Sequence, residues 1–552
     1  MNLINPLYSG KRIWLFYFTC FVFVASAQPT IETTAERSNY QSTSTYDEVR
    51  AFERELLSKS THMKVEIIGR SIEGRDIPLW ILADPMPGNP DDLLHDDRIV
   101  IYIQANIHAG EVEGKEAAQM FARDLLTNSQ RYIFDHVVLL ICPILNADGN
   151  EKISTQHRTN QNGPVNGVGV RHNAQFLDLN RDAMKLETPE IQGVVMNILN
   201  RWDPAITVDC HTTNGSYHEE PVTITWMVNP NGDRNLINYM RDVCMPAISR
   251  NLLQERKVEN VFYGEFIHRL ELEKGWISYA AEPRYFTNYL GIRNRLAILN
   301  ENYVYADFKT RVMGCYHLLW TLVEYAAENR KQIQKLLEVA DQKQQNRIFG
   351  HGVTDSFAIR YEGAPTPDPV TIKAFEADTI PGVQGYWRYK KSDRKRTVTV
   401  PYIADYFPTT SVPVPYAYLI TVPEQSIISN LQMHGIQMEL LNTVITLEVE
   451  QFNLDGLKGA TQLNQGHYTN EVSGAFSQVT REFPKGTMVI RTTQKLGILA
   501  AYLLEPQSDD CLLKWNFFDR YLVPQWTGGF YPYPVFKLAE SAILDTSPMK
   551  HP

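Results

Sequence analysis

The chain has 552 residues, of which 43% are hydrophobic and 21% charged, and its formal net charge at pH 7 is −10. The length predicts roughly two or three domains, and the composition is that of a folded globular protein, which excludes a largely disordered chain. The sequence contains no basic stripe, so nucleic acid is disfavoured as a partner.

Residues 1–27 have the pattern of a secretory signal peptide. Lys11 and Arg12 precede an apolar run at 13–24, and Ala25-Ser26-Ala27 forms a small-residue cleavage motif. The run is too short for a spanning helix, which disfavours the alternative of an uncleaved anchor. We expect an exported chain, periplasmic or extracellular, with no stable membrane span after cleavage near residue 28.

Five cysteines remain beyond the signal peptide. Their number is odd, they are widely spaced and no C-x-x-C motif occurs, so they do not form a disulfide framework. At most one or two bridges are possible, and the buried strand contexts of Cys142 and Cys210 favour inert core thiols. The five are Cys142, Cys210, Cys244, Cys315 and Cys511.

Residues 28–45 are polar and rich in Ser and Thr, and we expect a mobile leader there. Helical spacing begins at Tyr46 with Thr45 as a candidate cap. Beyond this helix, strands and helices alternate up to about residue 346. We expect a hairpin whose turn is at 69–75, and further strands at the apolar runs 99–103, 137–144, 205–210 and 295–299. The expected helices are 46–58, 111–126, 189–199, 233–255 and 308–344, and a long polar loop spans 150–178.

This alternation predicts an α/β domain over residues 46–346, with a mixed, mainly parallel central sheet flanked by helices. Short alternating runs at 397–400, 417–422, 444–449 and 488–492 then predict a mostly β second domain over 347–552. An aromatic run at 514–521 could cover a cleft, but packing in the β core is the favoured interpretation.

Four chemistry-bearing residues fall at the ends of predicted strands. His108 and Glu111 follow the 99–103 strand, His211 follows the 205–210 strand, and Glu301 follows the 295–299 strand. Parallel strands place their carboxyl ends along one edge of the sheet. Two histidines and a carboxylate form a catalytic zinc site that keeps one position for water, and Glu301 would be the general base for that water.

The order of five landmarks resembles the zinc metallocarboxypeptidases of the carboxypeptidase A-like family. The landmarks are Gly69-Arg-Ser-x-Glu-Gly-Arg75, His108-x-x-Glu111, Asn146-x-Asp-Gly149, Asp178-Leu-Asn-Arg181, and His211 after an apolar strand. The resemblance covers about half of the chain, from Tyr46 to about Val312.

The resemblance implies a role for each matching residue. His108, Glu111 and His211 fall on the zinc-ligand positions, with one Zn²⁺ per chain, and Glu301 falls on the catalytic carboxylate position. Asn180 and Arg181 match the pair that binds the terminal carboxylate of the substrate, which suits the planar fork of Arg. Arg158 falls near the arginine that stabilises the transition state.

Two features depart from the family pattern. Ala109-Gly110 replaces the arginine that the family often has inside the H-x-x-E turn. The mobile active-site tyrosine has three candidates here, Tyr279, Tyr285 and Tyr289, and spacing does not choose among them. No residue of the specificity pocket is identified, so the preferred terminal side chain stays open.

We therefore expect an exported zinc metallocarboxypeptidase whose partner is a peptide or peptide-like substrate with a free carboxylate. The alternative is a zinc amidohydrolase that acts on acyl amino acids or cell-wall peptides. A second alternative is a catalytically silent binding protein, which the complete set of expected residues disfavours.

Overall fold

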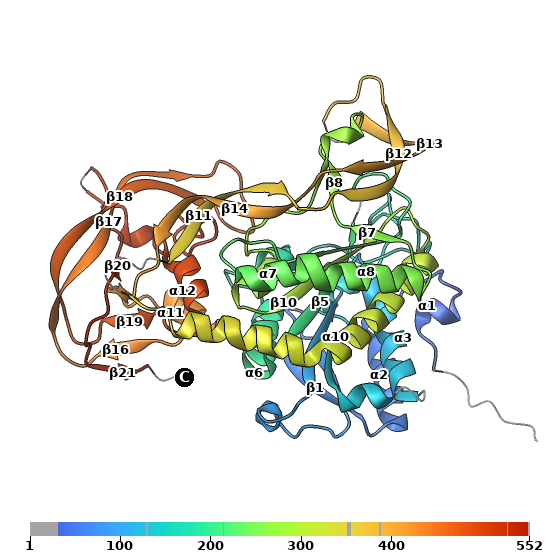
Figure 1. The fold of residues 1–552 in the computed structure, drawn as a ribbon, viewed down its shortest axis with the longest axis horizontal. Coiled ribbons are helices and arrows are strands. Elements are labelled where there is room, and N and C mark those ends of the chain that lie inside the picture. Colours follow the sequence, from blue (N-terminus) through green and yellow to red (C-terminus); the bar gives the residue numbers. More distant parts are fainter. Residues whose placement is uncertain are drawn as a thin grey trace, which may run out of the picture. The chain divides into compact units, whose positions relative to one another are not determined.

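The computed structural model describes residues 31–127, 131–213, 215–349, 355–385, 388–526 and 528–549 (Figure 1). The predicted signal peptide lies outside the described residues, and so do positions 28–30 of the predicted leader.

An eight-stranded mixed sheet forms the centre of the first half, in the order β1-β2-β4-β3-β5-β10-β6-β7. The pairs β3/β4, β3/β5, β5/β10 and β6/β7 are parallel, and β1/β2, β2/β4 and β6/β10 are antiparallel. The strands are β1 Met63–Arg70, β2 Asp76–Leu82, β3 Ile99–Ala105, β4 Val137–Cys142, β5 Ile206–Thr213, β6 Val222–Trp226, β7 Asn260–Phe262 and β10 Leu296–Tyr303. The predicted α/β class with a mixed sheet is confirmed.

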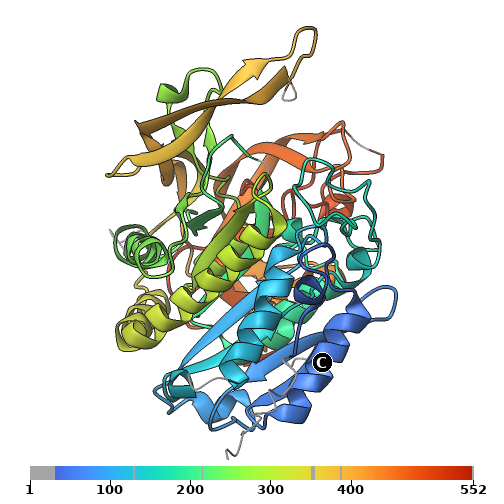
Figure 2. The same cartoon turned by 90° about the vertical axis from the view of Figure 1, so that its right-hand side faces the viewer.

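Helices cover both faces of this sheet, which explains the continuous apolar runs of β3 and β4. On one face α3 packs against both α2 and α10, and α10 also packs against α8 (Figure 2). Side chains of α5, η4 and α9 join the core on the other side. These elements are α2 Tyr46–Lys59, α3 Glu113–Thr127, α5 Pro189–Val194, η4 Val195–Leu199, α6 Asn200–Trp202, α7 Arg234–Tyr239, η5 Met240–Cys244, α8 Met245–Gln254, α9 Phe286–Ile292 and α10 Phe308–Gln345.

Residues 32–45 of the predicted leader are attached to α3, which differs from the expectation of a mobile segment. They contain the short helix α1 (Thr34–Arg37), closed by a capping box from Thr33. The hydroxyl groups of Thr43 and Ser44 donate to the buried Glu116 carboxylate at 2.8 and 2.9 Å. These bonds hold the segment because a buried carboxylate requires hydrogen-bond donors.

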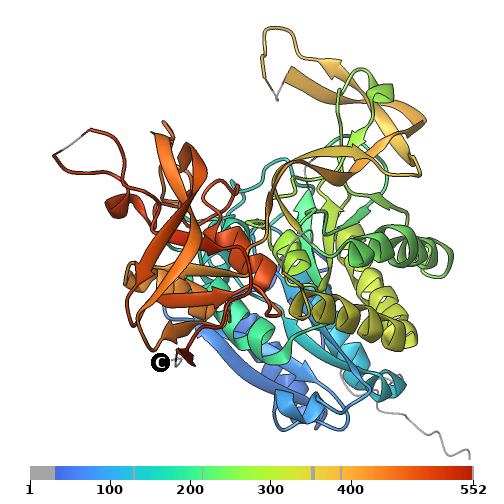
Figure 3. The ribbon, with the colours of Figure 1, turned by 60° about the vertical axis from the view of Figure 1, so that its left-hand side comes forward.

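The second half is mostly β, as predicted (Figure 3). A seven-stranded sheet has the order β18-β17-β20-β15-β19-β16-β21, and β12 pairs with β13 in a separate hairpin. The strands are β11 Ser356–Pro365, β12 Val370–Thr379, β13 Tyr389–Val400, β14 Tyr402–Pro413, β15 Ala417–Ile420, β16 Glu439–Leu441, β17 Ile445–Gly459, β18 Asn470–Phe483, β19 Met488–Arg491, β20 Val535–Leu538 and β21 Thr546–Pro548, and the helices are α11 Gln425–Met433 and α12 Gly497–Leu504.

The two halves of the chain contribute strands to a common sheet and side chains to a common core. A four-stranded sheet, β11-β14-β9-β8, takes β8 (Glu265–Phe266) and β9 (Trp276–Ile277) from the first half. One core cluster contains Phe286 of α9 together with Tyr502 and Phe518 of the second half. Trp515, in the predicted aromatic run, is also buried. The boundary at 346/347 stays a prediction.

The five cysteines beyond the predicted signal peptide are free and buried. The Sγ atoms of Cys210 and Cys315 lie 3.9 Å apart. Burial raises the pKa of the Cys142 thiol to about 12, as expected for an inert core thiol.

Candidate active site

The loop between β3 and α3 carries His108 and Glu111. The chain leaves β3 through Asn106, whose φ of 64° turns it sharply, and the Glu111 amide donates to the His108 carbonyl at 2.9 Å. Both side chains are buried, with exposed fractions of 2% and 3%. This turn therefore directs an imidazole and a carboxylate to the same point.

His211 and Glu301 lie inside strands, whereas the sequence predicted them just beyond strand ends. β5 and β10 pair in parallel as far as Thr213 and Tyr303, so both strands extend past the predicted limits. In this register Glu301 is the direct partner of His211. Paired residues of neighbouring strands project on the same face, which places the Glu301 carboxylate beside the His211 ring.

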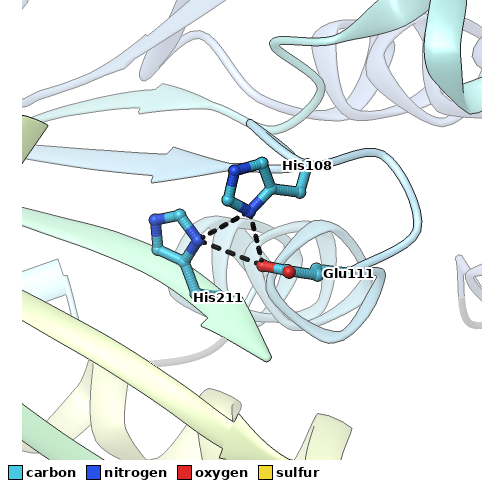
Figure 4. A group of neighbouring side chains, drawn as sticks. All are labelled: His108, Glu111 and His211. Atoms are coloured by element: carbon cyan, nitrogen blue, oxygen red, sulfur yellow. Dashed lines mark hydrogen bonds and ion pairs between the residues drawn. The ribbon is translucent and has the colours of Figure 1, made fainter. Parts of the chain in front are cut away.

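Three acceptor atoms of His108, Glu111 and His211 form a triangle (Figure 4). The Nδ1 atoms of the two histidines lie 3.2 Å apart. Glu111 Oε2 lies 3.1 Å from Nδ1 of His108 and 3.0 Å from Nδ1 of His211. Among the described residues, this is the group of His, Cys, Asp and Glu side chains that could hold a metal ion.

A carboxylate orients each imidazole from behind. His108 Nε2 lies 2.9 Å from Asp178 Oδ1, and His211 Nε2 lies 2.9 Å from Asp209 Oδ2. A proton on Nε2 of each ring satisfies these contacts and leaves both Nδ1 atoms as lone-pair acceptors. The sequence signal for Asp209 was its place two residues before His211 in a strand, which puts both on one face.

This donor set fits zinc. Tetrahedral zinc ligands at 2.0–2.1 Å from the ion stand about 3.3 Å from one another, close to the sides of this triangle. Two imidazole nitrogens and one carboxylate are typical catalytic zinc ligands, and carboxylate partners behind the rings are typical of such sites. Without a cation, three acceptor atoms at these distances would repel one another.

A cavity of about 280 Å³ opens beside the triangle. Its acidic and basic lining consists of His108, Glu111, Arg171, Arg181 and Glu301. Its neutral lining consists of Asn180, Thr212, Thr213, Tyr263, Tyr279, Ala280, Tyr285, Thr287 and Leu299.

Glu301 lines this cavity, and the pKa of its carboxyl group is raised. Burial, reinforced by the negative charge of Glu111, raises the pKa of Glu301 to about 8 although His211 opposes the shift. Its carboxylate forms no hydrogen bond with any described residue. In its ionised form, a carboxylate with no competing donor is free to accept a proton.

Asn180 and Arg181 lie in the 3₁₀ turn η3 (Leu179–Arg181) at the cavity wall. Arg181 Nη1 donates to the Asn180 carbonyl at 2.7 Å, and its guanidinium stacks 4.3 Å from the centre of the Tyr285 ring. Asp178 is 3.9 Å away, too far for a close ion pair. The Asn180 side-chain oxygen accepts from the Phe286 amide at 2.8 Å, which joins η3 to the start of α9.

The two loop arginines differ in position. Arg158, the predicted transition-state arginine, does not line the cavity. It donates to Glu111 Oε1 and to the Thr212 carbonyl, both at 3.0 Å. Its side chain lies over Gly110, where a Cβ would come within 2.6 Å of it. Arg171, which no sequence motif marked, lines the cavity and donates from Nε to Asp178 Oδ2 at 2.9 Å.

The three candidate tyrosines also separate. Tyr289 is buried away from the cavity with its hydroxyl 2.7 Å from Nδ1 of His434. Tyr279 lines the cavity, but its hydroxyl donates to the Trp226 carbonyl at 3.0 Å. The Tyr285 ring lines the cavity, and its hydroxyl has no hydrogen-bond partner among the described residues. Tyr263 lines the cavity as well, and no sequence motif marked it.

Among the described residues, none of the helices combines the length and the apolar character that a membrane crossing requires.

Several known proteins are similar to this chain. Residues 49–219 match the family model described as zinc carboxypeptidase. Carboxypeptidase 2 of Trichophyton equinum is 19% identical over 488 residues, 85% of this chain and 81% of that protein. Carboxypeptidase 2 of Trichophyton rubrum is 20% identical over 513 residues, 89% of this chain and 86% of that protein.

Two crystal structures are similar to about half of the chain. A metallo-carboxypeptidase from Burkholderia cenocepacia has a TM-score of 0.38 at 16% identity, covering 52% of this chain and 70% of its own. Carboxypeptidase A from Helicoverpa armigera has a TM-score of 0.38 at 16% identity, covering 53% and 75%. The family model confirms the resemblance over residues 49–219. Residues 49–219 are a domain of the zinc carboxypeptidase family, a family of zinc-dependent hydrolases.

Proposed function

We propose that this protein is an exported zinc carboxypeptidase that removes C-terminal residues from peptides. The observation that carries the proposal is the triangle of His108 Nδ1, His211 Nδ1 and Glu111 Oε2, with sides of 3.0–3.2 Å. Export rests on the signal-peptide pattern of residues 1–27, and the three ligands imply one zinc ion per chain. The domain limits at 46–346 and 347–552 are part of the proposal.

Zinc, when bound by these three residues, supplies a Lewis acid that polarises a carbonyl oxygen and acidifies water. Glu301 is the general base. It accepts the proton of the attacking water and returns it to the leaving amine. Its position in the cavity lining, its place beside His211 and the lack of a hydrogen-bond partner among the described residues support this role.

Arg181 binds the free carboxylate at the end of the substrate. Among the described residues only its Nη1 forms a hydrogen bond, to the Asn180 carbonyl, so Nε and Nη2 remain for a ligand in the cavity. Stacking on Tyr285 fixes the plane of the guanidinium. A planar fork held in this way can bind a carboxylate through two parallel hydrogen bonds.

Arg171, and not Arg158, is the arginine that stabilises the developing oxyanion. Arg171 lines the cavity and lies 3.6 Å from Glu111 Oε1. Arg158 donates hydrogen bonds to Glu111, the Thr212 carbonyl and Gln161. We assign Arg158 the task of holding Glu111 and compensating its charge.

Tyr285 is the active-site tyrosine among the three candidates. Its hydroxyl is not committed to another described residue, and its ring touches the arginine that binds the substrate carboxylate. The hydroxyl groups of Tyr279 and Tyr289 are held by Trp226 and His434.

A neutral terminal side chain fits the cavity. The lining away from the metal ligands includes Leu299, Thr287 and Ala280. The carboxylates of the lining, Glu111 and Glu301, already have roles in the reaction. An acidic or basic terminal side chain would therefore enter without a charged partner of its own.

The test compares peptides with a free C-terminal carboxylate and the same peptides with a C-terminal amide. We expect release of single C-terminal residues from the free peptides, loss of activity with a chelator and recovery with Zn²⁺. Glu301→Gln is the matched inactive control. Cleavage of acyl amino acids or cell-wall peptides in place of ordinary peptides would favour the amidohydrolase alternative. Full peptide binding by an inactive, metal-free protein would favour the silent binding protein.

A further inference from the structure

The β17–β18 hairpin of the C-terminal half ends in a tip formed by residues 460–469. Asn464 and His467 exchange two backbone hydrogen bonds of 2.8 and 3.0 Å around a two-residue turn. Both central residues have positive φ, 51° at Gln465 and 82° at Gly466. Such turns favour Asn, Asp or Gly at the first central position, so Gln465 is an unfavourable choice for the turn itself.

The side chain of Gln465 explains this choice. Its Oε1 accepts a hydrogen bond of 2.8 Å from the backbone amide of Asp178, 287 positions earlier in the chain. The tip is fixed on either side of this contact. His467 Nε2 lies 2.9 Å from the Glu187 carboxylate, and Asn516 donates to the Tyr468 carbonyl at 3.0 Å.

Asp178 is the residue through which this contact reaches the proposed active site. Its Oδ1 lies 2.9 Å from Nε2 of His108 and accepts from the Asn180 amide at 2.9 Å. Its Oδ2 accepts from Nε of Arg171 at 2.9 Å. One carboxylate thus orients a proposed metal ligand and an arginine of the cavity. Asp178 is the last residue of the long polar loop 150–178, which has little regular structure of its own.

We propose that Gln465 is a positioning residue of the active site, supplied by the C-terminal half. It holds the backbone at Asp178, and through Asp178 it fixes the His108 ring and Arg171. The inference rests on the proposed function. A residue in a strained backbone conformation with one long-range contact fits a functional constraint better than a requirement of the turn.

The substitution Gln465→Asn separates the two roles. Asn suits the left-handed conformation of the turn better than Gln does. Its side chain is one methylene shorter, so its carbonyl does not reach the Asp178 amide and the hydrogen bond is lost. Gln465→Gly likewise relaxes the turn and removes the amide. Gln478→Asn, at an exposed position of β18 in the same hairpin, is the matched control.

Three properties of each variant are measured: the melting temperature, the zinc affinity by competition with a chelator, and kcat and KM for a peptide substrate. For Gln465→Asn and Gln465→Gly we expect an unchanged or higher melting temperature. We expect zinc affinity and kcat/KM to fall by about three- to tenfold, less than for direct partners of a metal ligand. In an Asp178→Ala background the effect of Gln465→Asn on zinc affinity should disappear, because the connecting carboxylate is gone.

Zinc affinity and kcat/KM of both Gln465 variants within about twofold of the Gln478→Asn control would overturn the inference, since the contact would then have no functional effect. A melting temperature that falls in parallel with affinity would also overturn it, because the residue would then stabilise the hairpin only. If the parent protein binds zinc but hydrolyses no peptide, the proposed function fails while the zinc comparison still decides the role of Gln465.

Discussion

Asp178 and His108 are joined by a 2.9 Å contact between Oδ1 and Nε2, although they lie 70 positions apart in the chain. This contact fixes the tautomer of His108, so the ring presents Nδ1 to Glu111 and His211. The same carboxylate holds Arg171. The orientation of a proposed metal ligand and the place of a proposed oxyanion arginine therefore depend on one residue.

Replacing Asp178 by Asn should weaken zinc binding. The variant keeps an acceptor near Nε2 but loses the negative charge that makes His108 a stronger ligand and that holds Arg171. We expect zinc affinity to fall by about 10- to 100-fold, as for other carboxylates behind metal-bound histidines. Chelator competition measures the change, and Asp393→Asn, at a fully exposed side chain, is the control. Equal affinity in the two variants would contradict this role.

Replacing Glu301 by Gln should abolish turnover and leave the metal in place. Gln has nearly the same shape but cannot accept the proton of the attacking water, and a general base contributes about 10²- to 10⁴-fold to the rate. Steady-state kinetics and metal analysis of the same sample test this. A variant that holds zinc and keeps more than about half of kcat would rule out Glu301 as the base.

The two arginines should respond differently to substitution by Met. Arg171→Met should lower kcat by about 10²- to 10³-fold, the usual effect of losing a group that stabilises an oxyanion. Arg158→Met should act mainly on zinc affinity, because it removes the 3.0 Å partner of Glu111. Parallel measurements of kcat and metal affinity distinguish the two, and the opposite pattern would restore the sequence-based assignment of Arg158.

Glu190 predicts a pH dependence of stability away from the proposed active site. Burial, with smaller contributions from Asp148 and Asp182, raises the pKa of Glu190 from 4.5 to about 7. Below pH 4.5 the carboxyl is protonated in both the folded and the unfolded chain. Between pH 4.5 and 7 only the unfolded chain ionises, so the group lowers the free energy of unfolding progressively, by at most about 3 kcal/mol above pH 7.

Glu190→Gln imitates the protonated side chain and should remove this dependence. We expect the variant to be more stable than the parent at pH 8, with a smaller difference at pH 5. Urea unfolding at the two pH values measures the effect, and Glu255→Gln, at an exposed helix end, is the control. A difference between variant and parent that does not change with pH would contradict the shift.

Local sequence patterns predicted most of the helices and strands in the first half of the chain. The apolar runs at β3 and β4, the capped helix after Thr45 and the β1/β2 hairpin depend on neighbours in the chain, and their types were predicted correctly. Strand ends were less predictable. β5 continues through His211 because β10 pairs with it, and pairing of strands 90 residues apart leaves no local signal.

The candidate site divides in the same way. The sequence motifs marked His108, Glu111 and His211, but they could not reveal which groups lie behind the rings. Which loop arginine enters the cavity depends on the path of the 150–178 loop, and that path depends on tertiary contacts. No sequence motif could identify Gln465, because its hydrogen-bond partner is in the other half of the chain.

The most direct test of the central claim is the zinc content per chain of the parent protein and of His211→Ala after dialysis against a weak chelator. The three ligands predict one zinc ion per parent chain and almost none in the variant, whose triangle has lost one corner. A parent protein that takes up no zinc, or a variant that retains the full content, would contradict the convergence of these side chains on one ion.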